Sequence, residues 1–153
     1  MCADVVDAAT RSRMMAGIRG KDTAVEVAVR RQLHALGYRF RLHQKDLPGR
    51  PDIVRPRYRA AVFVHGCFWH RHAGCVYATN PATRPTFWQA KFEANVRRDA
   101  AAVERLMSGG WSVAVIWECA VSVKGVGLRD LRRLLTWLQA QPMTSSPAFL
   151  EIP

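Results

Sequence analysis

Two apolar segments, residues 60–64 and 111–117, restrict the fold of this chain more than any other feature. They lack the alternation of polar and apolar residues that marks a half-exposed strand, so each is typical of a central strand covered on both faces. Helical spacing of apolar residues predicts three helices, at 23–36, 86–108 and 128–141. Two shorter strands are predicted at 38–43 and 52–54. The order helix, three strands, irregular insertion, helix, strand, helix predicts a mixed α/β layer fold.

Local signals place the helix ends and the limits of the domain. Thr23 and Glu26 match a capping box, and Thr86 with Gln89 predicts the start of the second helix. A chain of 153 residues holds one compact domain, which we place at 22–141. Residues 1–21 form a basic N-terminal arm, and the Pro- and Ser-containing segment 142–153 is expected to be a poorly ordered tail.

Charge points to a polyanionic partner. Lys and Arg number 23 against 12 Asp and Glu, which gives a net charge of +11 at an apolar fraction of 49%. That apolar fraction excludes a disordered chain, and the charge favours nucleic acid, although some small basic proteins carry charge only for solubility. No apolar run reaches the roughly 18 residues of a membrane span, and the N-terminus lacks the order of a secretory signal. We therefore expect a cytoplasmic monomer without a membrane partner.

The segment 65–75 is dense in His and Cys. Cys67, His72 and Cys75 have the spacing of zinc ligands, and Cys119 after the last predicted strand is a fourth candidate. Three thiolates and one imidazole form a closed, structural zinc site. Two alternatives stay open: His70 takes the place of His72, or the cysteines are free buried thiols.

Three carboxylates are candidates for chemistry. Asp52 follows a Pro-Gly-Arg-Pro turn at a strand start, where a carboxylate often holds Mg²⁺ against a phosphodiester, although it is also an ordinary strand-entry residue. Glu26 is explained by the capping box but can also face a metal site. Asp99 lies on an apolar helix stripe, where it needs a partner unless the stripe is exposed.

Histidines and aromatic residues complete the candidates. His65 and His70 flank the zinc segment and can move protons at neutral pH, with a carboxylate such as Asp99 orienting a ring. Phe68, Trp69 and Trp88 are large apolar groups that either belong to the core or stack on bases. Met15 and Ile18 in the arm either pack on the domain or wedge between base steps.

Several segments together resemble the bacterial very-short-patch repair DNA mismatch endonucleases. The most specific is the block His65-Gly66-Cys67-Phe68-Trp69-His70. The other matching stretches are 7–18, 22–26, 47–52, 63–64, 81–88, 95–99 and 110–120. The resemblance spans roughly residues 4–120.

The resemblance implies a restriction-endonuclease-like mixed sheet flanked by helices, with a structural zinc. It implies Mg²⁺-dependent nicking of double-stranded DNA 5′ of the T in a T·G mismatch left by deamination of 5-methylcytosine. That lesion implies a functional link to a DNA cytosine-5 methyltransferase. Without the resemblance, a restriction enzyme for matched sites and a zinc-stabilised DNA-binding module without catalysis stay as alternatives.

The resemblance also implies residue roles. Asp52 and the backbone carbonyl of Val64 hold Mg²⁺, while Glu26 and His65 hold water molecules around it. His70 is the general base and Asp99 its support. The implied zinc ligands are Cys67, His72, Cys75 and Cys119. The implied DNA-intercalating residues are Phe68, Trp69, Trp88, Met15 and Ile18.

Overall fold

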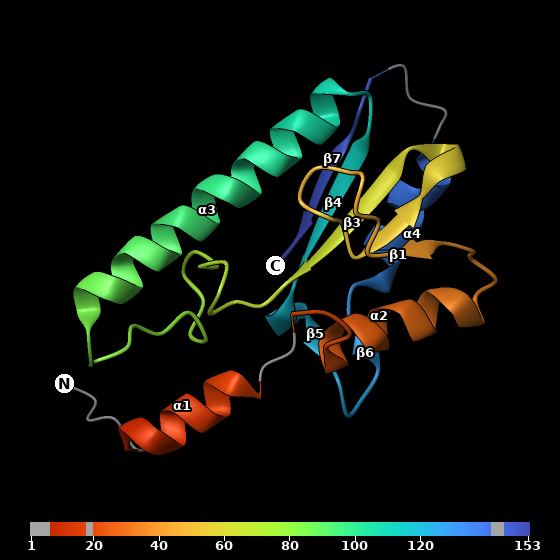
Figure 1. Cartoon of the computed structure of the whole chain (residues 1–153). Coiled ribbons are helices and arrows are strands. Elements are labelled where there is room, and N and C mark those ends of the chain that lie inside the picture. The colour runs from red at the N-terminus through yellow and green to blue at the C-terminus, as the bar shows by residue number, and fades with distance from the viewer. Residues whose placement is uncertain (1–6, 18–19, 142–145) are drawn as a thin grey trace.

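The computed structural model describes residues 7–17, 20–141 and 146–153 (Figure 1). Its helices are α1 (Ala8–Ala16), α2 (Ala24–Ala35), α3 (Pro85–Ser108) and α4 (Leu131–Ala140). Its main sheet contains β1 (Arg41–Leu42), β2 (Ile53–Arg55), β3 (Ala60–His65), β4 (Ser112–Trp117) and β7 (Phe149–Ile152). A second, small sheet pairs β5 (Val121–Ser122) with β6 (Gly127–Leu128). Two short 3₁₀ turns lie at Pro56–Tyr58 and Glu118–Ala120.

The main sheet is mixed, as the sequence predicts. Its order is β1-β2-β3-β4-β7, with antiparallel pairs from β1 to β3 and parallel pairs from β3 to β7. Every residue of β3 and β4 is buried. The two apolar segments are thus the centre of the sheet, covered on both faces, because helices lie on each side (Figure 1).

Alternate residues of β3 divide the core into two layers. Ala60, Val62 and Val64 pack with residues of α2 and α4, whereas Ala61 and Phe63 pack with residues of α3. This alternation follows from the two-residue period of a strand. His65 has the parity of Ala61 and Phe63, and it therefore lies on the α3 face at the end of β3.

The helix starts agree with the sequence at α2 but not at α3. Thr23 caps α2 by accepting a hydrogen bond from the Glu26 amide at 3.2 Å. In α3 the first residue is Pro85, preceded by Arg84 in the left-handed region with φ of +51° and no side-chain cap. The predicted start at Thr86 is wrong by one residue, because proline with its preset φ opens the helix there.

The expectation of a poorly ordered tail is wrong for the residues that the structure describes there. β7 pairs in parallel with β4, and Ile152 is only 1% exposed. The Ser112 hydroxyl donates to Gln141 at 2.8 Å and accepts from the Ala148 amide at 2.9 Å. These bonds and the free edge of β4 order the segment, so the domain extends past residue 141; residues 142–145 lie outside the described part.

Two further differences concern the N-terminal half. The strand predicted at 38–43 is limited to Arg41–Leu42, since only these residues pair with β2. In the predicted arm, Ala8–Ala16 is a helix capped by the Asp7 carboxylate, and none of its residues is buried. Figure 1 shows α1 apart from the main sheet. No helix of the described residues is long and apolar enough to cross a membrane.

Candidate active site and metal centre

A tight turn before β2 brings Asp52 to the end of β3. Gly49 has φ of +73°, and a Cβ atom there would lie 2.6 Å from the Ala102 side chain of α3, so only glycine fits. The chain then enters β2 beside β3, where Asp52 Oδ2 accepts a hydrogen bond from the Val64 amide at 2.7 Å. The structure thus brings together Asp52 and Val64, two residues predicted to hold Mg²⁺.

Asp52 lies in a place that opposes its charge. The pKa of Asp52 is raised to about 6, mainly by burial and also by the negative charge of Glu26. The Val64 amide, His43 and His70 act in the opposite direction. Burial and a neighbouring negative charge disfavour the ionised form of this carboxylate, and a bound cation would favour it. Carboxylate oxygen atoms suit Mg²⁺.

Glu26 belongs to the cap of α2 and acts electrostatically on Asp52. Its carboxylate accepts from the Asp22 amide at 3.0 Å and from the Thr23 hydroxyl at 3.2 Å. Glu26 is 5% exposed, and its charge acts on Asp52. The capping interpretation is therefore confirmed. The role of Glu26 at the metal site stays a prediction.

Sequence reasoning missed His43. Its Nε2 lies 3.2 Å from Asp22 Oδ1 and 3.7 Å from Glu26 Oε2, and its Nδ1 lies 3.8 Å from Asp52 Oδ1. The only signal in the sequence was a histidine at the end of a predicted strand, since Asp52 becomes its neighbour only through the pairing of β1 with β2.

A pair of stacked histidines lies at the end of β3. The ring centroids of His65 and His70 are 4.0 Å apart with an interplanar angle of 5°. Asp99 on α3 lies 2.5 Å from Nδ1 of His70, which supplies the partner that an acid on this stripe needs. Burial lowers the pKa of His65 to about 3, with the neighbouring His70 charge as a smaller cause, so His65 is neutral at physiological pH.

The hydrogen bond with Asp99 determines which nitrogen of His70 is available. A carboxylate accepts, so Nδ1 donates and Nε2 is left as the proton acceptor in the neutral ring. His70 also acts electrostatically on Asp52, so the imidazole lies within electrostatic range of that carboxylate. An imidazole oriented by an acid in this way can serve as a general base.

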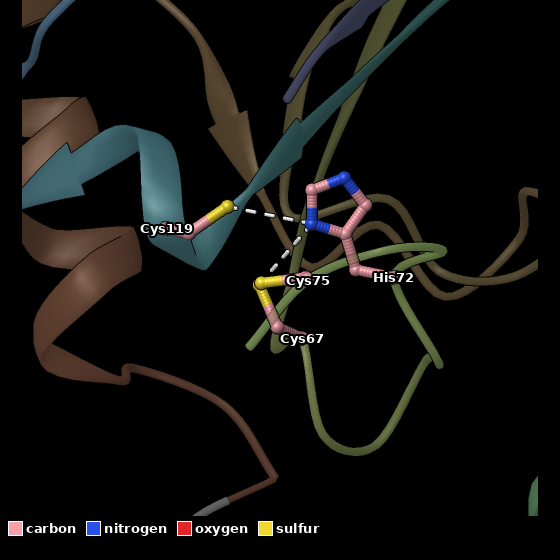
Figure 2. A group of neighbouring side chains, drawn as sticks. All are labelled: Cys67, His72, Cys75 and Cys119. Carbon is pink, nitrogen blue, oxygen red and sulfur yellow. Dashed lines mark hydrogen bonds between the residues drawn. The ribbon is translucent and has the colours of Figure 1, made fainter. Parts of the chain in front are cut away.

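A second group gathers the three cysteines with His72. Figure 2 shows Cys67, His72 and Cys75 from the loop after β3 facing Cys119 from the turn after β4. His72 Nδ1 lies 3.3 Å from Cys119 Sγ and 3.6 Å from Cys67 Sγ. One ligand atom from each residue lies within 4.8 Å of the others. The structure brings His72 to the thiols and places His70 against Asp99 instead.

The donor chemistry of this group fits zinc. Three sulfur atoms and one imidazole nitrogen, all within 4.8 Å of one another, are the ligand set of a closed tetrahedral site. Burial raises the pKa of the Cys67 thiol to about 12, so this thiol stays protonated until a cation displaces the proton. The His72 ring is stacked on Trp117 at 4.3 Å, which fixes its orientation.

Three polar residues that sequence reasoning missed hold the loop after β3. Arg71 donates to the carbonyls of Thr79 and Ala78 and to the Asn80 side chain, at 2.9, 3.0 and 2.7 Å. Asn95 on α3 donates to the Trp69 carbonyl at 3.0 Å. Glu118 accepts from the Cys67 amide at 3.1 Å. A loop without periodicity is thus tied to α3 and to the end of β4.

The predicted aromatic residues form one cluster. Phe68 makes edge-to-face contacts with Trp69 at 5.1 Å and with Trp88 at 5.7 Å. All three are half-buried, and Phe92 closes the cluster toward the core. Lys91 lies 5.3 Å from the Trp69 ring, and the cluster therefore combines accessible rings with positive charge.

The two N-terminal candidates stay predictions. Met15 lies half-buried on α1. Ile18 lies outside the described residues.

Comparisons with known proteins identify the family of this chain. The family model of the DNA mismatch endonuclease Vsr matches residues 3–76. The Type II nicking enzyme V.XorIIP of Xanthomonas oryzae pv. oryzae is 50% identical over 125 residues, which cover 82% of this chain and 91% of that protein. The DNA mismatch endonuclease Vsr of Escherichia coli is 47% identical over 119 residues, covering 78% and 76%. The nicking enzyme V.NmeAIP of Neisseria meningitidis is 37% identical, covering 86% and 94%.

A relative of similar length at half identity shares the fold and the kind of enzyme. The chain belongs to the Vsr DNA mismatch endonuclease family and is a DNA endonuclease.

Proposed function

We propose that this endonuclease nicks one strand of double-stranded DNA 5′ of the T in a T·G mismatch, with Mg²⁺ at the active site and zinc as a structural ion. The words "mismatch" and "nicking" in the names of the family model and relatives support this reaction. The restriction-endonuclease-like fold remains a prediction that the mixed sheet supports.

The observation that carries the proposal is the His70–Asp99 contact of 2.5 Å beside Asp52. DNA binding alone needs no oriented base, whereas hydrolysis of a phosphodiester does. With Nδ1 held by Asp99, Nε2 of His70 takes the proton of the attacking water. The Asp99 carboxylate then stabilises the imidazolium that forms.

The other polar residues hold the reaction site. Asp52 and the Val64 carbonyl would hold Mg²⁺, which when bound stabilises the charge that develops on the scissile phosphate. Glu26 and the neutral His65 hold water by hydrogen bonds. Because His65 is uncharged, it does not repel a protonated His70. The bond between phosphorus and the 3′ oxygen breaks, a water molecule held by Glu26 or His65 would protonate the leaving 3′ oxygen, and the product carries a 5′-phosphate.

Recognition of the lesion falls to the aromatic cluster. Phe68, Trp69 and Trp88 present accessible rings with Lys91 beside them. Inserting such rings between base steps costs unstacking energy, and a mismatched step costs less than a matched one. We propose that this difference gives selectivity, with Met15 and Ile18 approaching from the N-terminal side.

The substrate also suggests the biological setting. A T·G mismatch arises when 5-methylcytosine is deaminated, so the enzyme would act where a DNA cytosine-5 methyltransferase acts. One chain carries both groups of side chains, which supports a monomer. Free thiols at the zinc group suit the reducing cytoplasm.

A strand-resolved nicking assay tests the proposal. Labelled duplexes with one T·G pair, each other mismatch, or a matched pair are incubated with zinc-loaded enzyme and either Mg²⁺ or EDTA. We expect a nick 5′ of the T, only with T·G and Mg²⁺. Asp52→Asn should bind the duplex without nicking it, while Asp46→Asn, an exposed acid nearby, should nick normally. Equal cutting of matched DNA would indicate a restriction enzyme, and no nicking of any duplex with Mg²⁺ would refute the proposal.

A further inference from the structure

His43 lies between two sets of carboxylates and takes no part in the proposed reaction. Its backbone amide donates to the Asp52 carbonyl at 3.3 Å, so the β1–β2 pairing holds its ring beside that residue. Its φ of +48° lies in the left-handed region. Its side chain is 22% exposed, and solvent can therefore still reach the ring.

The contacts of His43 Nε2 determine the state of Nδ1. Nε2 lies at hydrogen-bond distance from Asp22 Oδ1, at 3.2 Å, and 3.7 Å from Glu26 Oε2. Both are acceptors, so Nε2 carries the proton. In a neutral ring Nδ1 then has a free lone pair.

That lone pair faces another acceptor. Nδ1 lies 3.8 Å from Asp52 Oδ1, which is too long for a hydrogen bond. Metal–ligand bonds of roughly 2.0–2.2 Å place two ligands of one ion at most roughly 4.4 Å apart. One divalent ion can thus contact both atoms.

Surrounding residues favour a cation at this point. Asp22, Glu26 and Asp52 all lie within 3.8 Å of the His43 ring nitrogens. A carboxylate on the far nitrogen is the usual partner of a metal-binding histidine, because it fixes the tautomer and raises the basicity of the ligand. Here Asp22 has that position, and Arg30 at 2.7 Å holds Asp22 in turn.

We propose that Nδ1 of His43 is a direct ligand of the divalent ion at Asp52, with Asp22 orienting the ring. The inference rests on the proposed metal-binding role of Asp52. It adds a nitrogen ligand to a site that otherwise offers oxygen atoms.

Mn²⁺ is the probe, because it takes oxygen-rich sites like Mg²⁺ and is paramagnetic. Zinc-loaded enzyme is titrated with Mn²⁺, and pulsed electron paramagnetic resonance then measures coupling of the bound ion to ¹⁴N. Wild type should show ¹⁴N coupling. His43→Gln should lose the ¹⁴N coupling and bind Mn²⁺ at least about tenfold more weakly. Even the loss of a group that only hydrogen-bonds to a metal ligand weakens metal binding by about that factor. The control His34→Gln, an exposed histidine at the end of α2, should leave both unchanged.

The outcomes separate this inference from the proposed function. Asp52-dependent Mn²⁺ binding without ¹⁴N coupling in wild type would overturn the role of His43 and leave that of Asp52, and it would assign His43 to ion pairing alone. Coupling that persists in His43→Gln would come from another histidine and would also overturn it. Mn²⁺ binding that Asp52→Asn does not weaken would refute the metal-binding role of Asp52 and the inference with it. The wild-type spectrum decides the question even if His43→Gln does not fold.

Discussion

At the residue scale, the surroundings of Asp52 disfavour the charged form of its carboxylate. The Asp52 side chain is 17% exposed, and both this partial burial and the negative charge of Glu26 raise its pKa. As a proposed metal ligand, Asp52 should lower the stability of the metal-free protein, and binding of the cation should raise that stability. Stability and metal binding at Asp52 should therefore be coupled, and pH is the variable that separates them.

Asp52→Asn should stabilise the metal-free protein at neutral pH. A pKa of about 6 in place of 3.8 corresponds to a cost of about 3 kcal/mol for the ionised group. The folded state binds this proton more tightly than the unfolded state, so the cost is absent below about pH 4 and complete above about pH 6. Denaturant unfolding should show the variant about 1–3 kcal/mol more stable at pH 7.5 and equal to wild type at pH 3.5.

Added Mg²⁺ provides the control for this prediction. It should stabilise wild type with increasing concentration but not Asp52→Asn. A variant that is less stable than wild type at pH 7.5 would show that the surroundings do not disfavour the charged form of Asp52.

His70 and His72 should behave differently although they are two residues apart. His70→Ala removes the proposed base and should lower the nicking rate constant by about 10²–10⁴ with zinc content unchanged. His72→Ala removes a contact of Cys67 and Cys119 and should lose zinc, with a lower unfolding midpoint. Metal analysis measures the zinc content, thermal unfolding the midpoint and single-turnover nicking the rate constant. Zinc loss in His70→Ala would contradict the assignment of His70 to catalysis and of His72 to zinc binding.

At the element scale, two segments take their structure from what they contact. The loop after β3 is held by its cysteines and by Arg71, Asn95 and Glu118. The segment that follows α4 is held by the edge of β4. In neither segment does local sequence preference favour regular structure, so contacts distant in sequence decide it.

Ile152 tests the place of β7. The side chain is 1% exposed in the core layer between the sheet and α4. Ile152→Ala should lower the free energy of unfolding by about 2–5 kcal/mol. Phe149→Ala in the same strand, at a side chain that is 49% exposed, should cost less than about 1 kcal/mol. Equal, small effects in urea unfolding would mean that this strand does not pack on the sheet.

At the scale of the whole molecule, one small domain combines a strongly basic surface with a few acids at its site. The net charge is +11, yet Asp22, Glu26, Asp52 and Asp99 lie close to the proposed chemistry. In the proposed function, positive charge would hold the DNA backbone and the local negative charge would attract the divalent ion. Binding, lesion sensing and cleavage would then share one surface.

DNA affinity should fall steeply with salt. Candidate backbone contacts are the arm and Arg84, Lys91, Arg97 and Arg98. About six to ten phosphate contacts would lower affinity by about 10³–10⁵ between about 50 and 200 mM salt. Fluorescence anisotropy with Asp52→Asn and Ca²⁺ measures binding without cleavage. A flat salt response would contradict the electrostatic interpretation.

The sequence predicted the parts of the structure that depend on local pattern. The two apolar segments became the central strands, and the Thr23–Glu26 cap formed as expected. The four zinc candidates came together, and Asp99 found a histidine partner. Spacing and residue chemistry suffice for such features, because each needs only a short segment or a strongly restricted set of ligands.

The sequence by itself determined the mixed α/β class, the central strands and the candidate metal-ligating and catalytic residues, since hydrophobic period and donor chemistry are local properties. Only the tertiary structure decided that His72 rather than His70 meets the thiols, that the last residues form β7, and that His43 lies against Asp52. Each of these depends on strand pairing or on a loop path between elements. Such contacts join residues that are distant in sequence, and no local preference specifies them.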